Sequence, residues 1–260
     1  MIVLFLGVPE MGKTQAAMDY VNAHALTHRF FAVCRAGDWQ QESCDEYGQD
    51  RWRGLHWAPW ERQSYRERIY RACRIQAPQP ERRAWFDNAP DPGSTGRDNE
   101  GNIVFDPQVM EWARSLPENG LFRFGYPWEG DHVAELVKRV GGTTYVDDEI
   151  DLTALHGGWQ TNPLRDFCHR GRHMPNEQNE IGKIHILGAA RQVQSLHPDM
   201  TNLASVIFVF RLQGWRTLTR VVDEGIVDKS EIEIIRNLAP YHYKQWNPSR
   251  PASWGTLAPL

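Results

Sequence analysis

The residues best suited to chemistry stand at the start of the chain, where a glycine-bounded loop ends in a lysine and a threonine. They match the P-loop pattern G-x-x-x-x-G-K-[ST], and the candidate binding residues are Gly7, Val8, Pro9, Glu10, Met11, Gly12, Lys13, Thr14 and Gln15. Glycines in such a loop let backbone N–H groups turn toward an anion. The lysine contacts the β- and γ-phosphates, and the threonine hydroxyl can hold Mg²⁺. The pattern therefore predicts a site for ATP and Mg²⁺.

The flanks of this loop are those that a phosphate site requires. The apolar residues 2–6 predict a buried strand before the loop, and residues 13–27 favour a helix after it. A helix that begins at the loop adds its positive amino-terminal end to the site. These flanks distinguish the pattern from an ordinary glycine-rich turn.

A second chemical group, Asp147-Asp148-Glu149, follows the apolar residues 143–146. This arrangement is typical of a Walker B motif, whose acidic side chains stand at the carboxyl end of a parallel strand, where ligands bind in open α/β sheets. We expect Asp148 to hold Mg²⁺ and Glu149 to polarise the water that attacks the γ-phosphate. Asp147 is the alternative metal ligand, because the strand could end one residue earlier.

Two polar residues, Arg191 and Gln192, follow shortly after a strand predicted over residues 183–187. Many P-loop ATPases place a polar side chain there, where it reports whether the γ-phosphate is present. Either residue is therefore a candidate sensor, and a simple exposed turn is the alternative.

A basic cluster over residues 169–173 contains Arg170 and Arg172. Such cations could reach across a subunit boundary as an arginine finger. They could equally contact a phosphodiester backbone or form ordinary surface charge.

The elements that must position these residues alternate between strands and helices. Short apolar runs predict strands over residues 2–6, 29–35, 121–124, 143–146, 183–187 and 205–210, with helices over 131–140 and 162–169. Continuous apolar strands separated by helices indicate a mostly parallel sheet covered on both faces. We expect one α/β P-loop NTPase domain of the RecA-like (ASCE) class over residues 1–260. A partly structured insertion over 36–120 and an arm or poorly ordered tail over 237–260 would decorate it.

Composition limits the remaining possibilities. A formal net charge of −4 argues against a generally basic nucleic-acid coat, although residues 51–53 and 66–74 are locally rich in arginine. The four cysteines are scattered without a C-x-x-C pair, which favours free thiols in a reducing compartment. No apolar stretch approaches the roughly 18 residues that a membrane span requires. We therefore expect a cytoplasmic protein.

Taken together, these motifs resemble the HerA/FtsK superfamily of DNA-translocating ATPases, and especially its viral genome-packaging branch. The P-loop and the acidic strand end match in order and spacing. So do an Arg-Gly-Arg-His segment before a strand, a polar sensor after that strand, and a final strand ending in Phe-Arg-Leu; these segments cover residues 170–173, 186–192 and 202–212. The resemblance extends over residues 1–35 and 121–220. The insertion at 36–120 has no counterpart in it.

The resemblance implies a homo-oligomeric ring, a hexamer, with ATP bound between subunits and double-stranded DNA passing through the centre. A capsid vertex or portal would be the docking partner, and the protein would work in the host cytoplasm or remain with the virion. Arg170 or Arg172 would then act on the neighbouring subunit's ATP.

Two other interpretations stay open from the residues. A Zot-like phage morphogenesis ATPase shares the P-loop, the acidic strand end and a similar basic segment, but that group normally carries a membrane span. A small-molecule P-loop kinase would need an acceptor pocket and an arginine-rich lid, for which the charged residues 61–75 are the candidate. Glu149 directly after Asp148 favours water over a substrate hydroxyl as the nucleophile.

Overall fold

The computed structural model describes residues 1–25, 27–34, 56–57, 85–178 and 180–257. The chain divides into two compact units. The first comprises residues 1–17, 147–172 and 185 onward, and the second comprises residues 18–146 and 173–184. The single domain expected over 1–260 stays a prediction.

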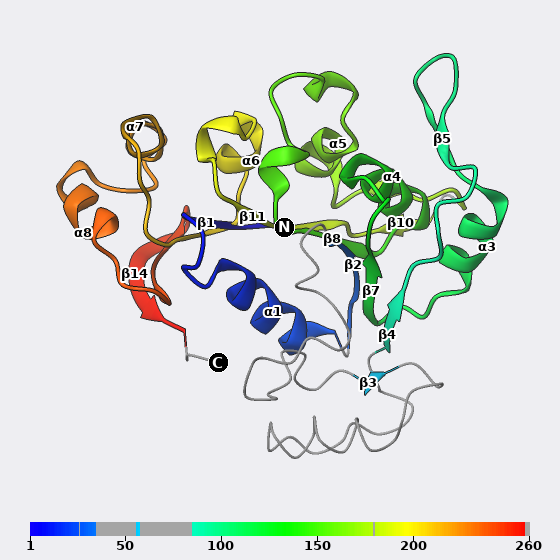
Figure 1. The fold of residues 1–260 in the computed structure, drawn as a ribbon, viewed down its shortest axis with the longest axis horizontal. Helices are drawn as coiled ribbons and strands as arrows, with labels where there is room; N and C mark the ends of the chain where they lie inside the picture. Colours follow the sequence, from blue (N-terminus) through cyan, green and yellow to red (C-terminus); the bar gives the residue numbers. More distant parts are fainter. Residues whose placement is uncertain (26, 35–55, 58–84, 179, 258–260) are drawn as a thin grey trace. The chain divides into compact units, whose positions relative to one another are not determined.

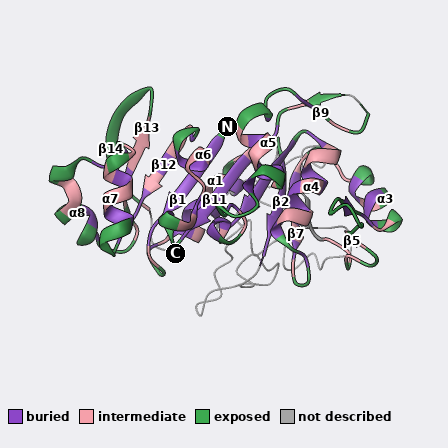
Figure 2. Ribbon diagram, turned by 90° about the horizontal axis from the view of Figure 1, so that it is seen from above, coloured by how far each residue is buried: buried purple, intermediate pink, exposed green. Residues whose placement is uncertain are grey.

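Strand β1 (Ile2–Leu6) lies inside the sheet of the first unit, between two parallel neighbours. It pairs in parallel with β11 (His185–Ala190) on one side and with β12 (Val206–Val209) on the other. Strands β13 (His242–Asn247) and β14 (Arg250–Thr256) extend the sheet antiparallel from β12. Figure 2 shows β1 and β11 buried almost throughout, whereas β14 is mostly exposed. The buried strands are the continuous apolar runs of the sequence, as expected for parallel strands covered on both faces.

Helices cover both faces of these strands. Helix α1 (Lys13–His24) begins on one face, and α6 (Pro198–Asn202) and α7 (Trp215–Asp223) lie on the other (Figure 1). The unit also holds α5 (Pro163–Arg170), α8 (Ile232–Arg236) and the short 3-10 helices η2 (Ile150–Leu152), η3 (Trp159–Thr161), η4 (Val193–Ser195) and η5 (Lys229–Glu231). The start of helix α5 is set by local sequence. The side chain of Asn162, the N-cap residue, accepts a hydrogen bond from the Leu164 N–H, and Pro163 occupies the first turn.

The second unit has its own parallel strands, in the order β8 (Thr143–Asp147), β2 (Arg29–Val33), β7 (Gly120–Phe124), β4 (Trp85–Asn88) and β3 (His56–Trp57). Its core is aromatic, with Phe30, Phe31, Phe122 and Phe124 buried. Helices α3 (Pro107–Ser115) and α4 (Gly130–Val140) belong to this unit. So do two small antiparallel pairs, β5 (Gly96–Arg97) with β6 (Ile103–Val104) and β9 (Met174–Pro175) with β10 (Ile181–Gly182).

The segment expected to be an insertion over 36–120 contributes to the sheet itself. Strand β4 pairs in parallel with β7, and β3 pairs in parallel with β4. The prediction of a mere decoration is therefore wrong for this part, because a strand as short as β4 between breakers gives little periodic signal. The charged helix expected over 61–75 and the arginine groups at 51–53 and 66–74 lie outside the described residues.

The carboxyl-terminal segment, expected to be an arm or a poorly ordered tail, is a β-hairpin over most of its length. β13 and β14 pair from His242–Thr256 to Asn247–Arg250. The turn between them is stabilised by the Asn247 side chain, whose Oδ1 accepts a hydrogen bond from the Ser249 N–H at 2.8 Å. The composition of this segment suggested disorder, whereas pairing with β12 orders it.

None of the helices in the described part of the chain has the length and apolar character needed to cross a bilayer.

Candidate nucleotide-binding site

The P-loop stands at the carboxyl ends of three parallel strands of the first unit. It follows β1 directly, and its first two N–H groups are fixed by the neighbouring strand ends. The Gly7 N–H donates to the Ala190 carbonyl at 3.1 Å and the Val8 N–H to the Arg211 carbonyl at 3.0 Å. Ligands bind at this edge in open α/β sheets, so the loop has the position that its sequence pattern predicts.

The conformation of the loop requires glycine at position 12. Gly12 has a φ of 93°, in the left-handed region that side-chain-bearing residues rarely adopt. A Cβ at this position would also come within 2.7 Å of Cδ1 of Tyr241, which follows α8. The same tyrosine donates its backbone N–H to the Met11 carbonyl at 3.1 Å. The carboxyl-terminal segment therefore packs against the P-loop. Sequence reasoning missed this contact because the two segments are far apart in the chain.

Lys13 is a buried cation inside this loop. Its Nζ donates a hydrogen bond to the Val8 carbonyl at 2.8 Å. Burial, and to a lesser extent the guanidinium of Arg191, lower the pKa of Lys13 to about 8, while the carboxylates of Asp151 and Asp148 oppose this shift. Because these three charged groups act on the ammonium, the predicted P-loop, Walker B and sensor residues belong to one electrostatic site. A triphosphate beside Lys13 would favour the charged form of its side chain.

The two aspartates at the end of β8, Asp147 and Asp148, differ in their contacts. Asp147 is fully buried, and its carboxylate accepts hydrogen bonds from the Glu149 N–H at 3.0 Å and from the Thr153 hydroxyl at 2.6 Å. Those bonds shape the turn that follows β8, so Asp147 is a structural residue. Of these two adjacent aspartates, only Asp148 is among the groups that raise the pKa of Lys13, which favours it over Asp147 as the metal ligand.

The donor set suits Mg²⁺. A threonine hydroxyl and a carboxylate, here Thr14 and Asp148, are the hard oxygen ligands that this ion prefers when phosphates complete its coordination. Thr14 follows Lys13 in the first turn of α1, and Asp148 acts electrostatically on that lysine.

The two candidate sensor residues point to different partners. The Arg191 guanidinium pairs with the Glu149 carboxylate at 2.5 Å. The side-chain oxygen of Gln192 instead accepts a hydrogen bond from the Ser195 hydroxyl at 3.3 Å, within the η4 turn. Arg191 is therefore the residue that contacts the expected catalytic carboxylate.

A buried carboxylate that sequence reasoning missed completes the cluster. Both oxygens of Asp151 accept backbone hydrogen bonds, from the Arg191 N–H at 3.3 Å and the Gln192 N–H at 3.0 Å. Its place two residues after Glu149 was the signal that could have identified it.

The structure does not bring Arg170 and Arg172 to the P-loop of their own chain. Both are exposed. Arg172 lies close enough to the amino-terminal ammonium of Met1 to lower its pKa, second to the effect of burial. Met1 precedes β1, and the P-loop follows it, so the basic segment belongs to the opposite end of that strand.

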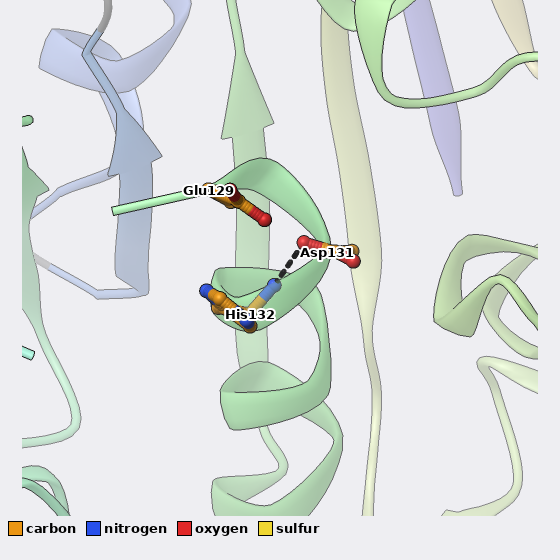
Figure 3. A group of neighbouring side chains, drawn as sticks. All are labelled: Glu129, Asp131 and His132. Carbon is orange, nitrogen blue, oxygen red and sulfur yellow. Dashed lines mark hydrogen bonds between the residues drawn. The ribbon is translucent and has the colours of Figure 1, made fainter. Parts of the chain in front are cut away.

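One further group of side chains in the second unit has the composition of a metal site. Glu129, Asp131 and His132 lie together where α4 begins (Figure 3). Asp131 is already engaged, because it accepts a hydrogen bond from the His132 N–H at 2.9 Å and pairs with Arg97. We assign no ligand to this group.

Solved structures match the protein over nearly its whole length. The genome packaging NTPase B204 from Sulfolobus turreted icosahedral virus 2 in complex with AMPPCP gives a TM-score of 0.59 at 12% identity, covering 100% of this chain and 98% of that one. The same NTPase in complex with ATP-gammaS gives 0.56 at 12% identity, covering 97% and 95%. VirB4 of Thermoanaerobacter pseudethanolicus gives 0.55 at 11% identity, covering 99% and 89%.

No family model and no curated protein matches the sequence. At such low identity the likeness concerns the fold. Together with the P-loop at the carboxyl ends of parallel strands, it establishes that the chain has the α/β fold of P-loop NTPases, which it shares with B204 and VirB4.

Proposed function

We propose that this protein is a Mg²⁺-dependent ATPase that translocates DNA, as a motor that packages a viral genome. The observation that carries the ATPase part is the single site formed by Lys13, Asp148, Glu149 and Arg191 at one edge of the first unit. Its charges act on one another, and phosphoryl transfer needs chiefly this combination of positioned cations and carboxylates.

Each of these residues has a task in hydrolysis. Lys13 binds the β- and γ-phosphate oxygens, and Thr14 and Asp148 would hold Mg²⁺, which offsets negative charge on the phosphates. Glu149 takes a proton from the water that attacks the γ-phosphate. Arg191, already bonded to Glu149, offers its guanidinium to the γ-phosphate. Gln192 has a lesser claim to the sensor role, because its side chain bonds within η4.

The basic segment suggests how subunits cooperate. Arg170 and Arg172 are exposed and lie away from the P-loop of their own chain. In a homo-oligomeric ring they could face the ATP of a neighbour and stabilise charge in the transition state. This arrangement requires an assembled ring, which we propose to be a hexamer.

DNA as the substrate is supported by the structural relatives. B204 is described as a genome packaging NTPase and a DNA-packaging ATPase, and this chain matches it over nearly its whole length. We extend that role to this protein, with duplex DNA as the polymer moved and a capsid vertex or portal in the host cytoplasm as the place of docking.

The experiment that tests this function measures phosphate release from ATP by the purified protein, with and without double-stranded DNA. The expected result is Mg²⁺-dependent hydrolysis without any acceptor, stimulated by DNA at several salt concentrations. Glu149→Gln is the matched control, which should bind ATP without hydrolysing it. A rate that ignores DNA would contradict the motor, and absence of hydrolysis would contradict the ATPase. A particle that stays monomeric with AMPPCP and duplex DNA would contradict the ring.

A further inference from the structure

Asp151 is a buried carboxylate that the mechanism above leaves without a task. It is 5% exposed. A carboxylate is seldom buried unless hydrogen bonds or cations compensate it. Here the compensation comes from the backbone N–H groups of Arg191 and Gln192, one on each oxygen, at 3.3 and 3.0 Å. Asp151 therefore binds the turn that carries Arg191.

The sequence brings η2 against this turn through a glycine in β11. A Cβ on Gly188 would come within 2.6 Å of Cδ1 of Ile150, so only glycine leaves room for that side chain. Ile150 is fully buried, and its packing against Gly188 places η2 beside β11. A further bond, from the His197 N–H to the Ala154 carbonyl at 2.8 Å, holds the two segments together beyond the turn.

The far side of the same turn is held by α7. Arg220 donates to the carbonyls of Val193 at 2.5 Å and Leu196 at 2.7 Å. The Thr217 hydroxyl donates to the side-chain oxygen of Gln194 at 2.5 Å. Helix α7 thus anchors η4, which leaves Asp151 to position residues 191–192.

We propose that Asp151 is a positioning residue that holds the 191–192 turn so that Arg191 can exchange between Glu149 and a γ-phosphate. This inference rests on the proposed ATPase function. Arg191 bonds Glu149 at 2.5 Å, and a γ-phosphate on Lys13 would compete for the same guanidinium. ADP has no γ-phosphate and would leave the Arg191–Glu149 pair in place. Asp151 thereby lets the site distinguish ATP from ADP and couples that distinction to the catalytic carboxylate.

The first test is Asp151→Asn, which keeps the shape of the side chain but replaces one accepting oxygen with an amide that cannot accept. Supporting groups of this kind typically change activity by about 10- to 100-fold, and we expect kcat to fall by about tenfold. Calorimetric titration with ATPγS and ADP should show weaker ATPγS binding, with the ADP affinity unchanged within about twofold. A fall in both affinities together would indicate a merely structural role and overturn the proposal.

A matched control acts on the same segment without touching the turn. The Asn162 side chain donates to the Thr153 carbonyl at 2.7 Å and caps α5. Asn162→Ala should lower the melting temperature while leaving kcat and the ATPγS preference unchanged. Gly188→Ala, which pushes Ile150 away from β11, supplies a second variant should Asp151→Asn fail to fold; it should lose the ATPγS preference.

A double-mutant cycle with Arg191→Ala decides whether Asp151 acts through the arginine. If it does, Asp151→Asn adds little in the Arg191→Ala background. If it lowers kcat there by the same factor as in the native protein, the inference is wrong. Should the native protein bind neither ATPγS nor ADP, the proposed function itself fails, which is a different outcome from retained nucleotide binding with an unchanged ATPγS preference in Asp151→Asn.

Discussion

Lys13 in the first unit and Arg29 in the second are both buried cations, and burial lowers the pKa of each. Their hydrogen bonds differ. Arg29 donates to the Thr143 hydroxyl at 2.9 Å and to the carbonyls of Gly141 at 3.0 Å and Leu116 at 3.3 Å. Among the described residues, Lys13 donates to the Val8 carbonyl of its own loop. Within the described part of the chain, the guanidinium thus bonds acceptors from other segments, whereas the ammonium bonds within its own loop.

Under the proposed function, Arg29 is a structural cation and Lys13 a functional one. Arg29 lines a cavity of ≈450 Å³ in the second unit, yet its donors bond a threonine hydroxyl and backbone carbonyls, which leaves little for a ligand. Lys13 has three donors, lies in a glycine loop and is influenced by carboxylates that suit a metal–phosphate complex. Burial of a cation is therefore poor evidence of function until its acceptors are counted.

The largest expected difference between the Lys13 and Arg29 variants is in the rate of ATP hydrolysis. Lys13→Met should lower kcat/KM for ATP by at least about 100-fold, the scale found when one transition-state donor is removed. Arg29→Met should leave kcat/KM of the folded protein within about threefold, because its donors serve the backbone. Steady-state phosphate release corrected for folded fraction checks both, and an equal loss in the two variants would break the distinction.

The free energy of unfolding should rank the two variants in the opposite order. Arg29→Met leaves a buried hydroxyl and several carbonyls without their donor, so it should lower the free energy of unfolding by about 2–4 kcal/mol. Lys13→Met removes a poorly compensated buried charge and should cost less than about 1 kcal/mol or even stabilise. Urea unfolding of both variants measures the difference. A more destabilising Lys13→Met would mean that the ammonium is part of the structural framework.

The smallest effect concerns pH. Lys13 has a pKa of about 8 in the folded protein against 10.5 ordinarily, so below pH 8 it is charged in both the folded and the unfolded chain. Between these values the unfolded chain holds more protons, and the free energy of unfolding should rise with pH. Arg29 stays charged throughout this range. Unfolding measured between pH 8 and 10.5 should show the native protein gaining stability relative to Lys13→Met but not relative to Arg29→Met. If stability changed with pH equally in the native protein and Lys13→Met, the burial assigned to Lys13 would be wrong.

The sequence predicted those candidate site residues that belong to short local patterns. The glycines of the P-loop, Lys13 and the acidic strand end are local patterns, and the strands that carry them are continuous apolar runs. The choice between Asp147 and Asp148 was out of reach, because it depends on a hydrogen bond from Thr153, six residues further on. The sequence likewise leaves the expected sensor role divided between Arg191 and Gln192, whose side chains have different partners in the structure.

Other features depend on contacts between distant segments. Asp151 belongs to the site only because Gly188 in β11 makes room for η2. Strand β4 was assigned to an insertion because its few residues carry no detectable period. From the sequence, the hairpin of β13 and β14 resembles an arm or a poorly ordered tail, because its partner β12 lies more than thirty residues earlier. Such pairings reflect tertiary structure that local propensity does not encode.

The hairpin also has a mechanical consequence. Leu257 donates its N–H to the Tyr241 carbonyl at 2.8 Å, and Tyr241 in turn holds the Met11 carbonyl and covers Gly12. Tension applied to β14 would therefore reach the P-loop turn through two backbone hydrogen bonds.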